Sequence, residues 1–294
     1  MAAQQTPPRL RVGVVGTGRA GSVLGAALQR AGHPVVAAYA VSDLSRVRAE
    51  ALLPGVPIVD QDTLFDMVDL VLLTVPDDAL VHVVSASVSR VRPGHVIVHA
   101  SGRYGCAVLD PLTAVGGLPL ALHPVMTFTG TSLDLSRLTG CPFGVTAPDP
   151  LLPMAQALVV EMGGEPMVIP EESRSLYHAA IAHAANHLMA LVCQSTDLLR
   201  TAGVASPELL LEPLLRAALD NALHHGDRVL TGPVARGDAD TVAAHIDVLA
   251  AASPQAQRTY VALARVTADR ALAAGVLAPE SAAALLTVLA GDRA

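Results

Sequence analysis

The basic residues of this sequence set a limit on its chemistry. Lys and Arg together number 19, and all of them are arginines, so the chain has no lysine. A lysine amine therefore cannot serve as nucleophile, Schiff base or general acid. The 11 histidines are the first candidates for proton transfer, because histidine exchanges protons near neutral pH.

A glycine-rich motif near the N-terminus has the pattern G-x-G-x-x-G. It is formed by Gly16, Thr17, Gly18, Arg19, Ala20 and Gly21. The motif follows an apolar run typical of a first strand and opens a stretch typical of a helix. In such a unit the first glycine permits a tight turn, the second lets the backbone approach a pyrophosphate, and the third allows close helix packing. The motif predicts a dinucleotide site at a helix N-terminus. A glycine turn without a ligand is the alternative.

The end of the second expected strand, Pro34–Val41, bears on which dinucleotide binds. Proteins that bind NAD usually have an acidic residue there, bonded to the ribose 2′-hydroxyl. This chain has Ser42 and, further on, Arg46, which suit a 2′-phosphate. NADP is therefore the expected cofactor, with NAD possible through Asp43. In the alternative interpretation, Arg46 lies on a solvated helix face.

Further candidate residues follow three of the later expected strands. They are Val75, Pro76, Asp77, Ser101, Gly102 and His123. Ligands of open α/β sheets bind beyond the carboxyl ends of the strands. We therefore expect the first three to contact the cofactor, Ser101 to orient a substrate, and Gly102 and His123 to line the substrate pocket. His99 ends an apolar strand and is interpreted either as a core residue or as a functional one.

A long helix is expected at Arg174–Leu199, and it carries His178 and Asn186. These two residues lie about 80° apart around the helix axis and about 12 Å apart along it, so they can line one wall of a cleft. His178 could instead form only a local hydrogen bond at the helix end. His183 and His187 are one turn apart, but no third ligand is apparent, so no metal site is predicted.

The segment 230–238 is rich in turn-forming residues and joins two expected helices. Asp238 is a plausible N-cap for the second of these helices. Arg236 is the candidate for chemistry, because a guanidinium can clamp an anion such as a carboxylate. The segment could also be a simple linker.

These residues need a scaffold, and the order of the expected elements predicts one. Strands and helices alternate through the first half, including a near-continuous apolar run at Asp69–Val75 and a short strand at Val56–Val59. The alternation predicts a doubly wound, Rossmann-like parallel sheet of the α/β class. From about Glu171 onward only helices are expected. We predict a dinucleotide-binding domain at residues 1–172 and an all-helical substrate and dimerisation domain at residues 173–294.

The composition excludes several classes of protein. Hydrophobic residues make up 52% and charged residues 15%, which argues against disorder. A net charge of −7 with 2% aromatic residues argues against nucleic acid as a partner. Two long uncharged windows are broken by prolines or by polar residues, so no membrane span is expected. Three widely spaced cysteines suggest a reducing, cytoplasmic location.

With these motifs, the chain resembles a family of two-domain Rossmann-like proteins over almost its whole length. Their C-terminal half is a domain of unknown function, and they lie in the 6-phosphogluconate-dehydrogenase-like group, near ketopantoate reductases and pyrroline-5-carboxylate reductases. The matching segments are GVVGTGRAG at 13–21, TVPDDAL at 74–80, VHASG at 98–102, LHPVMTF at 122–128, YHAAIAHAANH at 177–187 and LTGPVARGDADTVAAHI at 230–246.

The resemblance implies a reductase with its active site between the domains and a homodimer joined through the helical domain. Ketopantoate reductases have a catalytic lysine near the start of the long helix. His178 stands at the corresponding place here, with Asn186 two turns on, so the resemblance implies His178 as proton donor and Asn186 as a residue that orients the substrate.

The expected function is reduction by NADPH of a small carbonyl substrate, a 2-oxo acid of the ketopantoate kind. The alternatives are an imine reductase of the pyrroline-carboxylate kind and a non-catalytic, NADP-binding regulatory or assembly protein.

Overall fold

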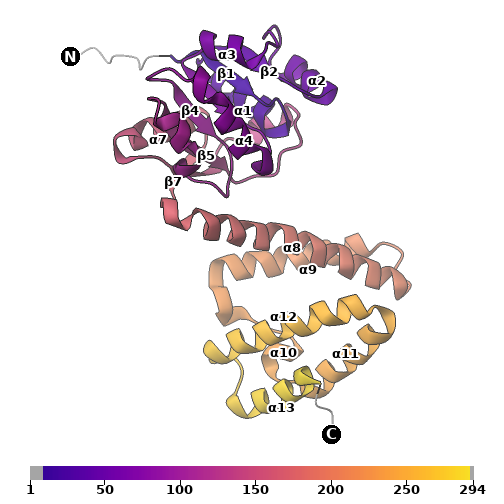
Figure 1. The fold of residues 1–294 in the computed structure, drawn as a ribbon. Helices are drawn as coiled ribbons and strands as arrows, with labels where there is room; N and C mark the ends of the chain where they lie inside the picture. The colour runs from indigo at the N-terminus through magenta and orange to yellow at the C-terminus, as the bar shows by residue number, and fades with distance from the viewer. Residues whose placement is uncertain (1–8, 292–294) are drawn as a thin grey trace, which may run out of the picture. The chain divides into compact units, whose positions relative to one another are not determined.

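A computed structural model describes residues 9–291 of the 294-residue chain (Figure 1). The chain divides into two compact units after Ala182. The domain boundary expected at residue 172 lies just before a long helix that begins at Arg174, whereas the division falls inside that helix. The boundary at 172 therefore stays a prediction.

The first unit is built on a seven-stranded sheet with the order β2-β1-β3-β4-β5-β6-β7. The strands are β1 (Val12–Val15), β2 (Val35–Tyr39), β3 (Leu70–Leu73), β4 (Val96–His99), β5 (Leu118–Pro124), β6 (Pro142–Thr146) and β7 (Glu165–Val168). All neighbouring strands pair in parallel except β5 and β6, which are antiparallel. The expected Rossmann-like α/β fold is confirmed.

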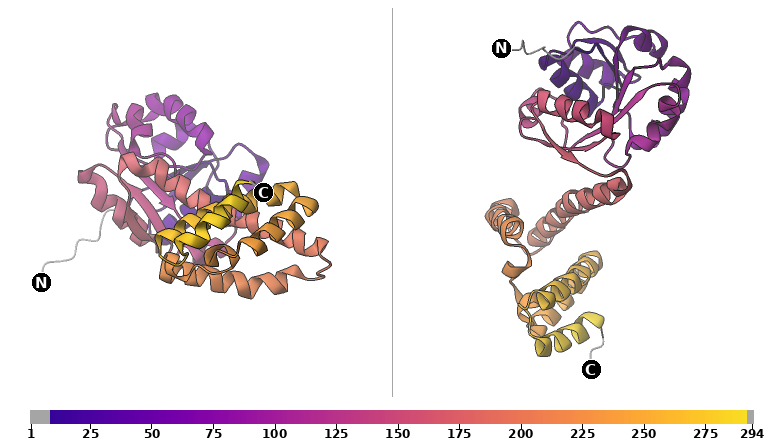
Figure 2. Two further views of the ribbon diagram at one scale, coloured as in Figure 1. Left: turned by 90° about the horizontal axis from the view of Figure 1, so that it is seen from below. Right: turned by 90° about the vertical axis from the view of Figure 1, so that its left-hand side faces the viewer.

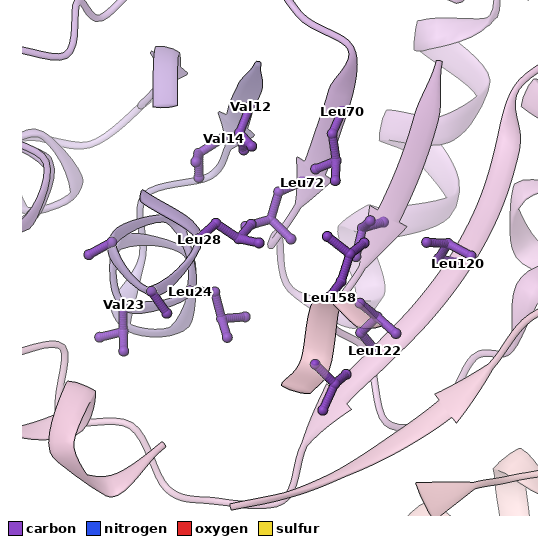
Figure 3. Packing of buried hydrophobic residues seen from close by; sticks show 14 of the residues in the cluster. Val12, Val14, Val23, Leu24, Leu28, Leu70, Leu72, Leu120, Leu122 and Leu158 are labelled. Carbon is purple, nitrogen blue, oxygen red and sulfur yellow. The ribbon is translucent and has the colours of Figure 1, made fainter. Parts of the chain in front are cut away.

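Helices cover both faces of this sheet. They are α1 (Arg19–Arg30), α2 (Asp43–Leu52), α3 (Gln61–Met67), α4 (Asp77–Ser87), α5 (Asp110–Thr113), α6 (Leu133–Arg137) and α7 (Leu152–Glu161). Side chains of a strand alternate between faces. In β3, Leu70 and Leu72 pack with α1 and α7 (Figure 3), while Val71 and Leu73 pack with α3 and α4. This explains why the apolar run at 69–75 is nearly continuous.

Two features of the sheet differ from the expectation. The segment Val56–Val59 is not a strand, because only Ile58 forms a bridge, to Ala38 of β2. The reversal at β5 and β6 adds an antiparallel pair to an otherwise parallel order. The register of this pair places Gly144 opposite His123, so β6 lies beside the carboxyl end of β5.

Long helices dominate the rest of the chain. They are α8 (Arg174–Thr201), α9 (Pro207–His225), α11 (Ala239–Ala252), α12 (Pro254–Ala273) and α13 (Pro279–Ala290), with the short α10 (Pro233–Arg236) between α9 and α11. Helices α10 to α13 lie together in Figures 1 and 2. They share an apolar core that includes Val242, Ile246, Ala268 and Leu285. Within residues 9–291, no helix combines the length and the hydropathy needed to cross a membrane.

Candidate active site

The glycine turn after β1 has the geometry that a pyrophosphate-binding turn requires. Gly16 has a φ of +97°, which favours glycine, and its amide donates to the Tyr39 carbonyl oxygen at 3.0 Å. A Cβ added to Gly21 would lie 2.1 Å from the Gly16 carbonyl oxygen. A Cβ added to Gly18 would have no atom within 4 Å, so the space above Gly18 is open.

The start of α1 is free of competing side chains. Gly18 is the N-cap residue and has no side chain to cap the helix, and the first turn, which Arg19 and Ala20 begin, contains no acidic residue. The first amides of a helix have no partner within the helix, so they can bind an anion here.

Two threonines hold the glycine turn in place. Thr17 is fully buried, and its hydroxyl donates to the Ser45 carbonyl oxygen at 2.9 Å, which ties the turn to α2. The Thr74 hydroxyl, at the end of β3, donates to the Gly16 carbonyl oxygen at 2.7 Å. The side chain of Thr17 is therefore structural, and only its backbone remains a candidate for cofactor binding. Thr74 was not singled out from the sequence.

The residues expected to select NADP lie on α2. Ser42 is the N-cap of this helix, and its hydroxyl accepts from the Ser45 amide at 3.2 Å, a capping role that accounts for a serine at this place. Arg46 is exposed and forms no ion pair with the residues described. Its expected contact with a 2′-phosphate stays a prediction.

A loop that sequence reasoning overlooked lies against two arginines near the glycine turn. A Cβ added to Gly130 would lie 2.9 Å from Arg19 Cγ and 3.0 Å from Arg48 Nε. Asp134 is fully buried and holds this loop, because its carboxylate accepts from the amides of Thr129 and Gly130 at 2.7 and 2.8 Å. Both arginine side chains therefore lie against this loop, close to the start of α1.

The turn after β3 leads into α4. Pro76 is the N-cap residue of this helix and Asp77 lies in its first turn. Val75 packs beside Gly16, since a Cβ added to that glycine would lie 3.2 Å from Val75 Cγ1. All three residues thus follow the carboxyl end of β3, next to the glycine turn, and their contact with a cofactor stays a prediction.

His99, at the end of β4, shapes the next turn. The ring is fully buried, with Nε2 2.8 Å from the Gly105 carbonyl oxygen and Nδ1 accepting from the Ser101 amide at 3.2 Å. Burial lowers the pKa of His99 to about 4, so the ring is neutral and both nitrogens are used. Of the two interpretations of His99, the structure favours the core residue.

Ser101 is buried and takes part in the same turn. Its Oγ accepts from the amides of Arg103 and Tyr104 at 3.2 and 3.3 Å. A hydroxyl that accepts two hydrogen bonds still has its own proton to donate. The expected role of Ser101 in orienting a substrate therefore depends on this O–H.

Three of the expected site residues meet at Gly102. A Cβ added to Gly102 would lie 2.6 Å from His178 Cδ2 and 2.8 Å from His123 Nε2. The rings of the two histidines are perpendicular, with their centroids 6.0 Å apart. Any other residue at position 102 would displace these rings, so the glycine lets the start of α8 and the end of β5 present histidines to the same space.

Arg174, the first residue of α8, is buried close enough to His123 to act on it electrostatically, and it was not singled out from the sequence. Its side chain is 1% exposed, and its guanidinium donates to the carbonyl oxygens of Ala121 and Gly144 at 2.8 and 2.9 Å and to Thr146 Oγ1 at 2.7 Å. Burial lowers its pKa. None of the described carboxylates forms an ion pair with it, although Glu171 acts on it from a longer distance, so a buried positive charge lies close to the site.

Tyr177 of α8 contacts residues of β5 and β6. Its hydroxyl lies 2.8 Å from His123 Nδ1, and a Cβ added to Gly144 would lie 2.4 Å from the hydroxyl oxygen. Burial lowers the pKa of His123 to about 4, and the charges of Arg174 and His178 act in the same direction. His123 is therefore neutral around pH 7.

The other expected residues belong to the second unit. Asn186 is exposed on α8, and Arg236 is exposed at the end of α10. Asp238 caps α11, as expected, by accepting from the Thr241 amide at 3.1 Å. The functional roles of Asn186 and Arg236 stay predictions.

The His183 and His187 rings approach each other, with 2.9 Å between their Nδ1 atoms. The part of the chain that the structure covers contains no group of three or more residues placed to bind a metal.

The glycine turn at the carboxyl end of β1 and the sheet order together define a Rossmann-type dinucleotide-binding fold. Comparison with protein families identifies the two parts of the chain. Residues 1–124 match the Rossmann-like domain, and residues 141–267 match DUF2520, a domain of unknown function. These two matches, a Rossmann-like domain followed by a DUF2520 domain, confirm the resemblance found in the motifs. The DUF2520 match includes β6 and β7 as well as helices α8 to α11.

Several solved structures are similar over most of the chain. A candidate NADP oxidoreductase from Bacteroides fragilis is 19% identical, with a TM-score of 0.71, and the match covers 89% of this chain and 98% of that one. A reductive aminase from Aspergillus terreus, in complex with NADPH and ethyl levulinate, is 17% identical, with a TM-score of 0.65 and coverage of 95% and 99%. A 1-pyrroline-5-carboxylate reductase from Streptococcus pyogenes is 16% identical, with a TM-score of 0.59 and coverage of 90% and 98%. At these identities the likeness shows the fold. No curated protein matches the sequence.

Proposed function

We propose that this protein is an NADPH-dependent reductase of a small carbonyl compound, a 2-oxo acid of the ketopantoate kind. The observation that carries the proposal is the meeting of His178 and His123 at Gly102, at the carboxyl ends of β4 and β5. The glycine turn follows β1, which runs parallel to β3, β4 and β5, so both features lie at one edge of the sheet, where such folds bind their ligands. Similar structures named for NADP or NADPH support the choice of cofactor.

The residues around the glycine turn fit a dinucleotide. The space above Gly18 is open, the amides at the start of α1 are free to bind a pyrophosphate, and Arg19 and Arg48 bring positive charge close by. NADPH, when bound, supplies the hydride that reduces the carbonyl carbon. Ser42 and Arg46 on α2 are the proposed contacts for the 2′-phosphate.

Reduction of a carbonyl also needs a proton for the oxygen. In the proposed reaction the imidazolium of His178 gives this proton to the substrate oxygen, and the product is an alcohol. Histidine suits this step because the chain has no lysine and because imidazolium is a competent acid near neutral pH. The Ser101 hydroxyl donates a hydrogen bond to the substrate. Asn186 and Arg236 are proposed to orient the substrate and to bind its carboxylate.

The proposal is tested by titrating the protein with NADPH and NADH and then supplying a panel of 2-oxo acids and cyclic imines while the absorbance of NADPH is followed. We expect tighter binding of NADPH, loss of that preference in Arg46→Ala, and oxidation of NADPH with a 2-oxo acid. Tight binding without turnover on any compound would instead identify a non-catalytic NADP-binding regulatory or assembly protein. Equal affinities for the two cofactors would contradict the choice of NADPH.

An imine reductase of the pyrroline-carboxylate kind is the second candidate. It is supported by the similarity to a reductive aminase and to a pyrroline-5-carboxylate reductase. Turnover of cyclic imines without turnover of 2-oxo acids would favour this function.

We also propose that the protein is a homodimer joined through its helical domain. The support is a set of leucines on α9 that are exposed to solvent, although leucines seldom gather on a surface without a partner. They are Leu209, Leu210, Leu214, Leu219 and Leu223, with exposed fractions from 49% to 76%.

The cytoplasmic location also stays a prediction, which rests on the number and spacing of the cysteines.

A further inference from the structure

We propose that Tyr177 is a positioning residue that holds His123 as a neutral hydrogen-bond donor, with its Nε2–H directed at the space beside Gly102. The group that His123 recognises is then an acceptor with lone pairs, namely a carbonyl or carboxylate oxygen of the substrate. This inference rests on the proposed reductase function for the identity of the substrate, but not for the geometry of the two residues.

The geometry comes from one hydrogen bond and one open nitrogen. The Tyr177 hydroxyl lies 2.8 Å from His123 Nδ1, and the two rings are perpendicular with centroids 5.6 Å apart. His123 Nε2 makes no hydrogen bond to any described residue and lies 2.8 Å from the place where a Gly102 side chain would begin. In a neutral imidazole one nitrogen donates and the other accepts. If the phenol donates to Nδ1, the ring proton must be on Nε2.

The surroundings of the phenol indicate that it donates. Burial raises the pKa of Tyr177, so the phenol keeps its proton. His123 Nδ1 is the one hydrogen-bond partner that the hydroxyl has among residues 9–291, so the phenol proton is directed at this nitrogen. Gly144 also leaves the room that the hydroxyl needs, since an added Cβ would lie 2.4 Å from it.

The charged and titratable groups around His123 keep its ring neutral. Burial is the largest cause, and Arg174, His178 and His99 also disfavour a second proton, whereas Asp77 favours one. The buried guanidinium of Arg174 adds positive potential at His123 and forms no ion pair among residues 9–291. A neutral N–H donor near a buried cation suits an anionic oxygen acceptor.

The arrangement also divides the work between the two histidines. His123 keeps its proton on Nε2 and orients the substrate, while His178 is the residue that exchanges a proton. This division explains why two histidines lie beside Gly102. A single ring cannot keep its proton as a permanent hydrogen-bond donor and also give up a proton as an acid in each turnover.

The test is long-range 1H–15N NMR of the full-length protein labelled with 15N-histidine, with NADPH present. We expect His123 to show a protonated Nε2 and an unprotonated Nδ1 from about pH 8 down to about pH 5.5, where an ordinary histidine would be protonated. Its signals are assigned by their loss in His123→Gln. In Tyr177→Phe we expect a mixture of tautomers. Tyr260→Phe is the matched control, because it removes a hydroxyl 3.0 Å from His245 Nδ1 in the second unit and should leave His123 unchanged.

The substrate class is tested with oxamate, an unreactive analogue of 2-oxo acids. Oxamate should shift the His123 Nε2 signal, and Tyr177→Phe should weaken oxamate binding about tenfold while NADPH binding is kept. A wild-type His123 protonated on Nδ1, or an unchanged tautomer in Tyr177→Phe, would overturn the positioning role, and the wild-type spectrum alone decides this if the variant does not fold. The absence of any His123 shift with oxamate would overturn the substrate class. The expected tautomer without turnover on the panel would overturn only the reductase function.

Discussion

Three histidines lie close together at the candidate site, yet their surroundings give them different tasks. His99 has both nitrogens engaged by the backbone, at Gly105 and Ser101. His123 has one nitrogen engaged, by Tyr177, and His178 has no hydrogen bond to the described residues. The number of engaged ring nitrogens therefore differs with the proposed task. His99 holds a turn, His123 can donate one hydrogen bond to a substrate, and His178 can exchange a proton.

The first prediction at the residue scale concerns His178. If it is the proton donor, His178→Asn should lower kcat by about 10²–10⁴-fold on the substrate found with the panel, which is the usual effect of losing a general acid. NADPH affinity should stay the same, and the pH–rate profile should lose one ionisation in the histidine range. His183→Asn, on the same helix, is the control. Full activity in a folded His178→Asn protein would move the role to another residue.

A second prediction concerns acid stability. Burial holds the pKa of both His99 and His123 at about 4 in the folded protein, below the ordinary 6.5. Between these values the unfolded chain binds more protons than the folded one, so the free energy of unfolding should fall as the pH falls from about 6.5 to about 4, and this contribution should level off below that. His99 alone accounts for a change on the order of 3 kcal/mol.

Urea denaturation at several pH values measures this dependence. His99→Gln should flatten it, whatever the variant does to stability at neutral pH, because glutamine does not titrate in this range. His183→Gln, at an exposed position, should leave the slope unchanged. A slope that is equally steep in His99→Gln would contradict the assignment of a neutral, buried His99.

At the scale of elements, the glycine turn and α1 allow a paired test. Gly18→Val should leave the fold intact, because an added Cβ at position 18 meets nothing within 4 Å, but it should abolish NADPH binding by filling the space of the pyrophosphate. Gly21→Ala should mainly lower thermal stability, because its Cβ would lie 2.1 Å from the Gly16 carbonyl oxygen. Calorimetric titration and thermal unfolding separate the two effects. Normal NADPH binding by Gly18→Val would mean that the motif is only a turn.

The elements also show how far local pattern can predict this structure. The strand and helix around the glycine turn were predictable, because an apolar run followed by G-x-G-x-x-G is a local signal. The strand expected at Val56–Val59 has the right residues but only one bridge, since sheet formation depends on a partner strand. Arg174 was not predictable, because its acceptors Ala121 and Gly144 lie on two strands that meet only in the folded chain.

The same limit applies to the candidate site. His123 and His178 could be selected by their places at a strand end and at a helix start. The sequence could not predict which ring nitrogen lacks a hydrogen-bond partner, because that depends on Tyr177 and on the absence of a side chain at Gly102 and Gly144. Long-range packing, rather than residue type, decides which histidine can act.

At the scale of the whole molecule, the helical region leaves large apolar side chains exposed to solvent. Helices α10 to α13 bury an apolar core, but α9 leaves several leucines open, including Leu214 and Leu223 with exposed fractions of 61% and 75%. On α8, Met189 is 66% exposed. Covering a leucine completely contributes about 1.5–3 kcal/mol, so a second copy that covered these side chains would gain a substantial free energy. The proposed homodimer follows from this unsatisfied surface.

We therefore expect the protein to be a dimer in sedimentation equilibrium at micromolar concentration, and the double variant Leu214→Glu, Leu223→Glu to be a monomer. Two carboxylates placed in an apolar interface would have to lose their hydration without gaining partners, which is costly. Val160→Glu is the matched control, because Val160 is 59% exposed on α7 in the first unit and should tolerate the charge without a change in mass. A monomeric wild-type protein, or a double variant that remains a dimer, would show that this face of the helical domain does not join two copies.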